Sequence, residues 1–152
     1  MEFIEALKQG KAEVEEFTNE EQRRLAELDE VFIELNKQVR SFTENKIAIK
    51  RSTDRLWLIA YNPKAHLPVY YKIAKWQESG KVYPCFITLK NTAATKLTGA
   101  DGLQIYPDNI LCCYNQSDVE AALQQLLKNT DVVKLLLNIE RGCVVKYSLF
   151  PD

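Results

Sequence analysis

Residues 19–43 read NEEQRRLAELDEVFIELNKQVRSFT, and the apolar side chains of this stretch recur at helical spacing. Steps of three, four and seven residues place such side chains on one stripe of an α-helix, with charged side chains on the remaining surface. Glu20 and Glu21 fall in the first turn, where the helix dipole favours acidic side chains. The stretch predicts an amphipathic helix that packs on its own domain. The apolar positions are Leu25, Leu28, Val31, Phe32, Leu35, Val39 and Phe42.

The residues before this stretch extend the helical pattern toward the N-terminus. Leu7 and Val14 continue the seven-residue spacing, but Gly10 costs a helix about 1 kcal/mol relative to alanine. Thr18 and Glu21 form a T-x-x-E capping box, which is typical of a helix start. The region therefore predicts two N-terminal helices, the second beginning near residue 19.

Polar residues interrupt the seven-residue repeat that a long coiled coil would need. Glu21, Arg24 and Gln38 occupy positions where a coiled-coil seam requires apolar side chains. Docking of the helix on its own domain is therefore expected. A homodimer formed through the N-terminal helices is the alternative.

After residue 46 the periodicity changes from helical to alternating, as in β-strands. Two hairpins are expected, followed by two short strands, two helices and a closing strand. Strands are predicted over 47–51, 56–61, 67–76, 82–89, 103–106, 109–114 and 143–149. Helices are predicted over 91–97, from Ser117, and from a cap at Asn129 or Thr130. This order predicts an α+β fold in which N-terminal amphipathic helices pack on a mainly antiparallel sheet, with two further helices and a C-terminal strand.

Length and composition indicate one globular domain over residues 1–152, with 46% hydrophobic and 27% charged residues. Neither a secretory signal nor a membrane-spanning segment is expected, which predicts a cytoplasmic protein. The charge is unevenly divided. Residues 1–46 hold twelve acids and seven bases, a balance of −5, whereas residues 47–152 hold nine acids and thirteen bases, a balance of +4.

No catalytic, metal or cofactor site is recognisable from residue spacing. The four cysteines lack the paired spacing of a zinc site and are expected to be free thiols, and His66 is the only histidine. No glycine-rich loop resembles a phosphate-binding motif. We therefore expect no metal, no cofactor and no catalytic residue. An enzyme of unrecognised type, which would need Cys85, His66 or several acids in one concave pocket, ranks third among the functional hypotheses.

The leading hypothesis is a protein-binding domain whose acidic N-terminal helix faces a protein partner. Carboxylates on an exposed helix face would steer a basic partner through complementary charge. A concrete form of this hypothesis is an inhibitor or immunity-type protein that neutralises a basic toxin or nuclease. The predicted partner-binding acids are Glu20, Glu27, Asp29, Glu30 and Glu34.

The alternative hypothesis is a nucleic-acid-binding domain that uses the second predicted hairpin. Strict alternation would place the side chains of Tyr70, Lys72 and Trp76 on one face, with Lys81 and Tyr83 on the returning strand. Aromatic rings can stack on bases while lysines contact phosphates. The net charge of −1 and the isoelectric point of 5.9 argue against a broad cationic surface, so this hypothesis ranks second.

Overall fold

The computed structural model describes residues 2–61, 67–90, 109–142 and 149, and the backbone of 97–98 and 104–105. Three helices and a five-stranded antiparallel sheet confirm the predicted α+β class. The helices are α1 (Glu2–Phe42), α2 (Gln116–Lys128) and α3 (Thr130–Glu140). The strands are β1 (Ile47–Arg51), β2 (Arg55–Ala60), β3 (Val69–Glu78), β4 (Cys85–Leu89), β5 (Leu97–Thr98), β6 (Gln104–Ile105) and β7 (Asn109–Cys113).

The N-terminal region is one continuous helix of 41 residues, so the prediction of two helices was wrong. Neither Gly10 nor the capping box at Thr18 interrupts it. Exposed i,i+4 ion pairs support the helix on either side of Thr18. Lys11 pairs with Glu15 at 3.9 Å, and Arg24 pairs with Glu20 at 3.0 Å. The local cost of one glycine is about 1 kcal/mol, which the cooperative hydrogen bonding of a long helix can absorb.

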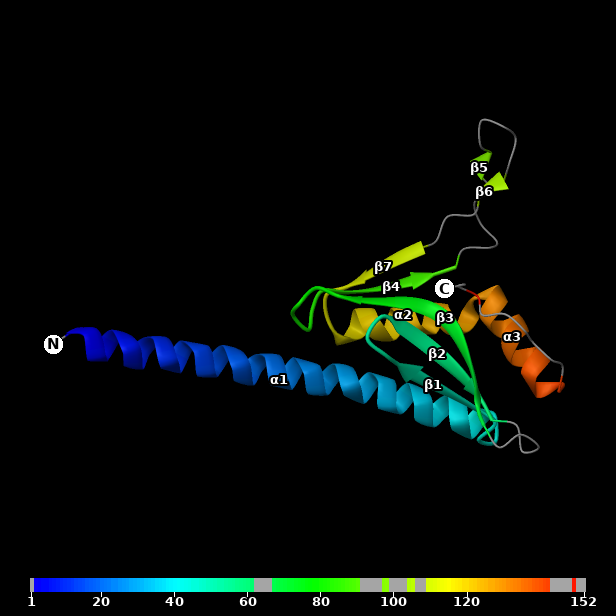
Figure 1. Cartoon of the computed structure of the whole chain (residues 1–152), viewed down its shortest axis with the longest axis horizontal. Coiled ribbons are helices and arrows are strands. Elements are labelled where there is room, and N and C mark those ends of the chain that lie inside the picture. Colours follow the sequence, from blue (N-terminus) through cyan, green and yellow to red (C-terminus); the bar gives the residue numbers. More distant parts are fainter. Residues whose placement is uncertain are drawn as a thin grey trace.

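The main sheet has the order β1-β2-β3-β4-β7, and all four pairings are antiparallel. A separate two-stranded pair joins β5 to β6. α1 packs against β1, α2 packs against β7, and the two helices contact each other. They therefore lie side by side on one face of the sheet, which we call the helix face, and the opposite face is called the open face (Figure 1).

Buried apolar side chains attach the C-terminal part of α1 to the helix face. Leu28, Val31 and Val39 are buried, and the Phe32 ring meets the Trp76 ring edge-on with centroids 5.4 Å apart. The predicted apolar stripe is confirmed over this part of the helix. Two predicted members of the stripe are not covered, because Leu25 is 45% exposed and Phe42 is 81% exposed.

A register shift in β3 divides its side chains between the two faces. Trp57 pairs with Lys72 whereas Leu56 pairs with Ala74, so Ile73 is an extra residue in β3. A single extra residue reverses which face the following side chains occupy. Lys72 therefore faces the open side and Trp76 the helix side, and the prediction that both share one face was wrong.

Asparagine side chains cap the two C-terminal helices. Asn115 Oδ1 accepts from the Asp118 amide at the start of α2, two residues before the predicted start at Ser117. Asn129 Oδ1 accepts from the Asp131 and Val132 amides at the start of α3, as predicted. Residues 91–96 of the predicted helix over 91–97 and most of the predicted strand over 143–149 lie outside the described residues, and Leu97 belongs to β5 instead of the predicted helix.

Candidate protein-docking site

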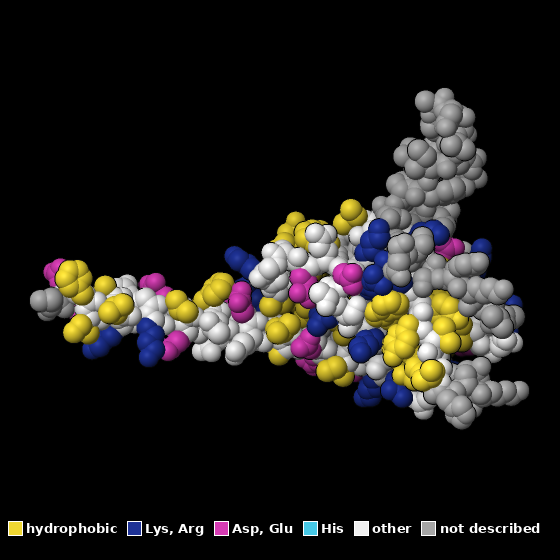
Figure 2. Space-filling model, viewed as in Figure 1, with side chains coloured by type: hydrophobic (Ala, Val, Ile, Leu, Met, Phe, Trp, Pro, Cys, Tyr) yellow, Lys and Arg dark blue, Asp and Glu magenta, His cyan; other side chains and the backbone are white. Residues whose placement is uncertain are grey.

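The first half of α1 extends past the sheet and carries uncovered apolar side chains. We call this part, residues 2–24, the overhang; at 1.5 Å per residue it is about 35 Å long. Five of its apolar side chains are more than half exposed: Phe3 74%, Ile4 60%, Leu7 73%, Val14 64% and Phe17 51%. Figures 1 and 2 show the overhang standing clear of the sheet, with apolar and charged side chains intermixed along it.

The overhang presents its apolar side chains in the same direction as the buried side chains of the docked half. At about 100° per residue, Leu7, Val14 and Phe17 lie within about 80° of one another around the helix axis, and Leu28 falls inside that sector. The stripe that packs on the sheet therefore continues beyond it. A second molecule placed beside the overhang would meet an extension of an interface that α1 already forms with its own sheet.

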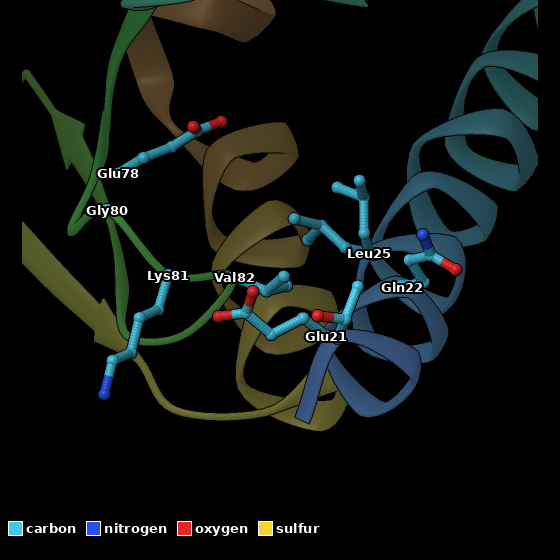
Figure 3. A pocket seen from close by; sticks show the side chains of 9 residues that line it. Glu21, Gln22, Leu25, Glu78, Gly80, Lys81 and Val82 are labelled. Atoms are coloured by element: carbon cyan, nitrogen blue, oxygen red, sulfur yellow. The ribbon is translucent and has the colours of Figure 1, made fainter. Parts of the chain in front are cut away.

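A groove lies where the overhang leaves the domain. It has a volume of about 300 Å³ and separates α1, from Thr18 to Leu28, from the turn between β3 and β4. Figure 3 shows Glu21 and Leu25 on the helix side and Glu78 and Val82 on the opposite side, while Lys81 points away from the helix. The groove offers apolar contacts bordered by carboxylates.

The overhang is also acidic. Residues 2–24 contain seven glutamates and four basic residues, a balance of −3. The charge of Glu20 is partly balanced within α1, because its carboxylate accepts hydrogen bonds from Arg23 and Arg24. An apolar stripe with an acidic border suits a surface whose apolar centre has a basic border.

The five predicted acidic residues do not form one face. Glu20, Glu27 and Glu34 follow each other at seven-residue steps along the flank of α1 nearest α2, where the Gln116 side chain donates to the Glu27 carbonyl oxygen. Glu30 points away from the sheet. Asp29 lies on the flank nearest β1, about 180° from Glu20 around the helix, and accepts from Arg51 at 2.6 Å.

The predicted aromatic and basic residues are also divided. Tyr70 and Lys72 lie on the open face, where Tyr70 is exposed but Lys72 is buried. Trp76 is 2% exposed beneath α1 and donates from its indole to Glu78. Lys81 is exposed in the turn after β3. Tyr83 lies near Glu27 and the buried thiols of the helix face, and burial raises the pKa of its hydroxyl.

Cys85 and Cys113 are cross-strand neighbours in the core, and Cys112 is exposed; all three are free. The hydrogen bond to Cys113, together with burial, raises the pKa of Cys85, which disfavours a nucleophilic thiolate. His66 and Cys143 lie outside the described residues. Within the described part, no three His, Cys, Asp or Glu side chains are grouped so as to hold a metal ion, and no helix is long and apolar enough to cross a membrane.

The sequence indicated Leu7, Val14 and Phe17 by their spacing, but it gave no sign that they are uncovered. A stripe that docks on its own domain and one that extends past it have the same periodicity. The buried part of α1 begins at Leu28, and this position depends on where the sheet ends in space. No family model, curated protein or solved structure matches this chain.

Proposed function

We propose that this chain is a protein-binding domain that docks its partner on the overhang of α1. The observation that carries this proposal is the continuation of the core-packing stripe of α1 past its own domain, where Phe3, Leu7, Val14 and Phe17 remain exposed. Exposed contiguous apolar surface is costly in water and is typical of sites that a partner covers. The acidic border selects a partner with a basic surface.

The more specific form of the proposal is an inhibitor or immunity-type protein that neutralises a basic toxin or nuclease. Its support is the charge balance of −3 over residues 2–24, set against the +4 balance of residues 47–152. An acidic helix that covers a cationic active site would compete with an anionic substrate there. Addition of the purified chain in equal amount should then abolish the partner's activity.

The test compares capture by the full chain with capture by two variants. Leu7→Asp combined with Phe17→Asp places charge in the stripe of the overhang, and both positions are exposed, so the fold should be retained. Ile33→Asp is the matched control, because Ile33 is 67% exposed on the docked half and points away from the sheet. The expected result is a basic protein that binds the parent and Ile33→Asp and loses at least tenfold in affinity for the double variant.

Two outcomes would overturn the proposal. One is a partner that binds all three chains equally well. The other is a parent chain that is dimeric by light scattering and becomes monomeric in the double variant, because a second copy would then occupy the stripe. With the purified partner, raising the salt concentration should slow association, since steering by exposed charges is screened.

A further inference from the structure

The open face of the sheet gathers aromatic and cationic side chains from four strands. Residues directly opposite one another in antiparallel strands share a face. The register aligns Lys50 with Trp57 and Lys72 in one row. A second row aligns Arg55 with Lys75.

Three aromatic rings lie among these cations. Trp57 and Tyr70 meet edge-on with ring centroids 6.0 Å apart, and Tyr70 is 49% exposed. Arg55 lies over the Trp57 ring, 5.4 Å from its centroid, and Ser52 accepts a hydrogen bond from the Trp57 indole. These contacts hold the Trp57 ring in place. Phe86, partly exposed, extends the aromatic surface onto β4, where it pairs with Gln77 and Cys112.

The described charged side chains on this face are cationic: Lys50 and Lys75 are exposed, Arg55 is partly exposed, and Lys72 is buried, with 8% of its surface exposed. Asp54, in the turn just before β2, is the acid next to Arg55 in the sequence, and the two side chains form an ion pair at 3.3 Å. Figure 2 shows dark blue and yellow side chains gathered together in the part of the molecule that holds the sheet.

We propose that the open face binds single-stranded nucleic acid, with bases stacked on Tyr70 and Phe86 beside Trp57 and phosphates contacted by Lys50 and Lys75. Cations alone would suit any polyanion. Planar aromatic rings in the middle of the cations favour unpaired bases, which stack on such rings whatever their sequence. The overall charge of −1 does not oppose this, because the acids are concentrated on α1, and α1 packs on the other face.

This site is independent of the overhang, and its residues differ from those that the sequence suggested. Of the predicted hairpin set, Tyr70 belongs to the proposed site, and Lys72 lies on the same face but is buried. The tryptophan of the proposed site is Trp57 and not Trp76. Trp57 precedes Trp76 by 19 positions and belongs to another strand. Binding at the open face would therefore survive loss of the overhang stripe.

The experiment titrates a labelled single-stranded dT12 oligonucleotide with the full chain and follows fluorescence anisotropy at 50 and 200 mM salt. We expect micromolar binding at low salt that weakens about tenfold or more at high salt, since each phosphate contact releases counterions. Lys50→Glu combined with Lys75→Glu changes two exposed residues and should abolish binding. Tyr70→Ala should weaken it about tenfold.

Matched controls use exposed residues outside the open face. Lys81→Glu should leave the affinity unchanged, and so should Leu7→Asp with Phe17→Asp. In a Trp76→Phe variant the oligonucleotide should still quench tryptophan fluorescence, because Trp57 remains as the reporter. Absence of binding at 50 mM salt would overturn the proposal. The proposal would also fail if the control variants lost as much affinity for dT12 as the open-face variants. Competition by polyglutamate as strong as that by unlabelled dT12 would indicate a site for acidic peptides instead.

Discussion

Arg51 of β1 donates from Nη2 to Oδ1 of Asp29 in α1 at 2.6 Å, and the same guanidinium group lies over the two aromatic rings that join helix to sheet. Its central carbon is 4.7 Å from the centroid of Phe32 and 5.2 Å from that of Trp76. The Arg51 side chain is mostly buried. One cation therefore fixes the point at which α1 stops packing on the sheet and begins to leave it.

Replacement of Arg51 should destabilise the fold more than replacement of its partner. Arg51→Ala removes the ion pair and both ring contacts and should lower the free energy of unfolding by about 2–3 kcal/mol. Asp29→Asn keeps a hydrogen-bond acceptor and should cost about 1 kcal/mol. Urea denaturation measures both. Arg23→Ala, in an exposed pair on the overhang, is the control and should change stability by less than about 0.5 kcal/mol; an Arg51→Ala effect no larger than this would contradict the assignment.

Gly10→Ala should stabilise the overhang without changing the stability of the core. An alanine Cβ at this position would meet no atom within 4 Å, so only the helix propensity changes, by about 1 kcal/mol. Because no residue before Leu28 is buried, the overhang can open locally while the sheet stays folded. Hydrogen exchange around residue 10 should slow about fivefold while the urea midpoint stays constant. Ala12→Gly should have the opposite effect; a shifted midpoint with unchanged exchange would argue against local opening.

Asn129→Ala should cost more than the equivalent substitution at the other cap. Asn129 caps α3 through Oδ1, and its Nδ2 also donates to the Lys90 carbonyl oxygen at 2.8 Å, joining the start of α3 to the end of β4. We expect a loss of about 2 kcal/mol in unfolding free energy, against about 1 kcal/mol for Asn115→Ala. Thermal or urea unfolding of both variants measures which substitution lowers the unfolding free energy more. Equal losses would show that the bond to Lys90 contributes little.

Thiol reactivity should separate Cys112 from the two core cysteines. Cys112 is exposed on the open face and should react with iodoacetamide in the native protein. Cys85 and Cys113 should react only after unfolding, because both are buried, although the hydrogen bond from Cys85 lowers the pKa of Cys113. Peptide mapping by mass spectrometry after timed alkylation measures each site separately. Reaction of Cys113 at the rate of Cys112 would mean that β7 opens readily.

The raised pKa of Cys85 has a consequence for stability at alkaline pH. Below the unfolded value of about 9 the thiol is neutral in both states, and the contribution is constant. As the pH rises above that value, the unfolded thiol loses its proton while the native thiol keeps it. The contribution of Cys85 to stability should therefore fall above about pH 9, and Cys85→Ser or Cys85→Ala should remove this contribution in urea titrations at pH 8 and 10.

Local patterns predicted the elements whose signals lie within a few residues. The strand over 47–51, the cap at Asn129 and the docked stripe of α1 around Leu28 and Val31 all follow from spacing and from side-chain chemistry. The continuity of α1 did not follow. A glycine and a capping box are weak signals, and the helix on either side of them outweighs both.

The candidate sites depended on geometry that spacing does not contain. The extra residue at Ile73 moves Trp76 from the open face to the helix face, and pairing with β2 decides this rather than the sequence of β3. The open-face set of Lys50, Trp57 and Lys75 is assembled from three strands. Acids that were grouped by proximity along α1, such as Asp29 and Glu30, face different neighbours because successive helical residues diverge by about 100°.

The division of α1 at Leu28 means that the fold constrains the two parts of one helix to different degrees. From Leu28 onward, a change of apolar side chain disturbs the packing of the sheet, so the fold itself restricts what can vary. Over residues 2–24 the fold imposes little beyond helix formation. Substitutions of exposed side chains in this part of the helix should therefore cost little in folding free energy, whereas those after Leu28 should not.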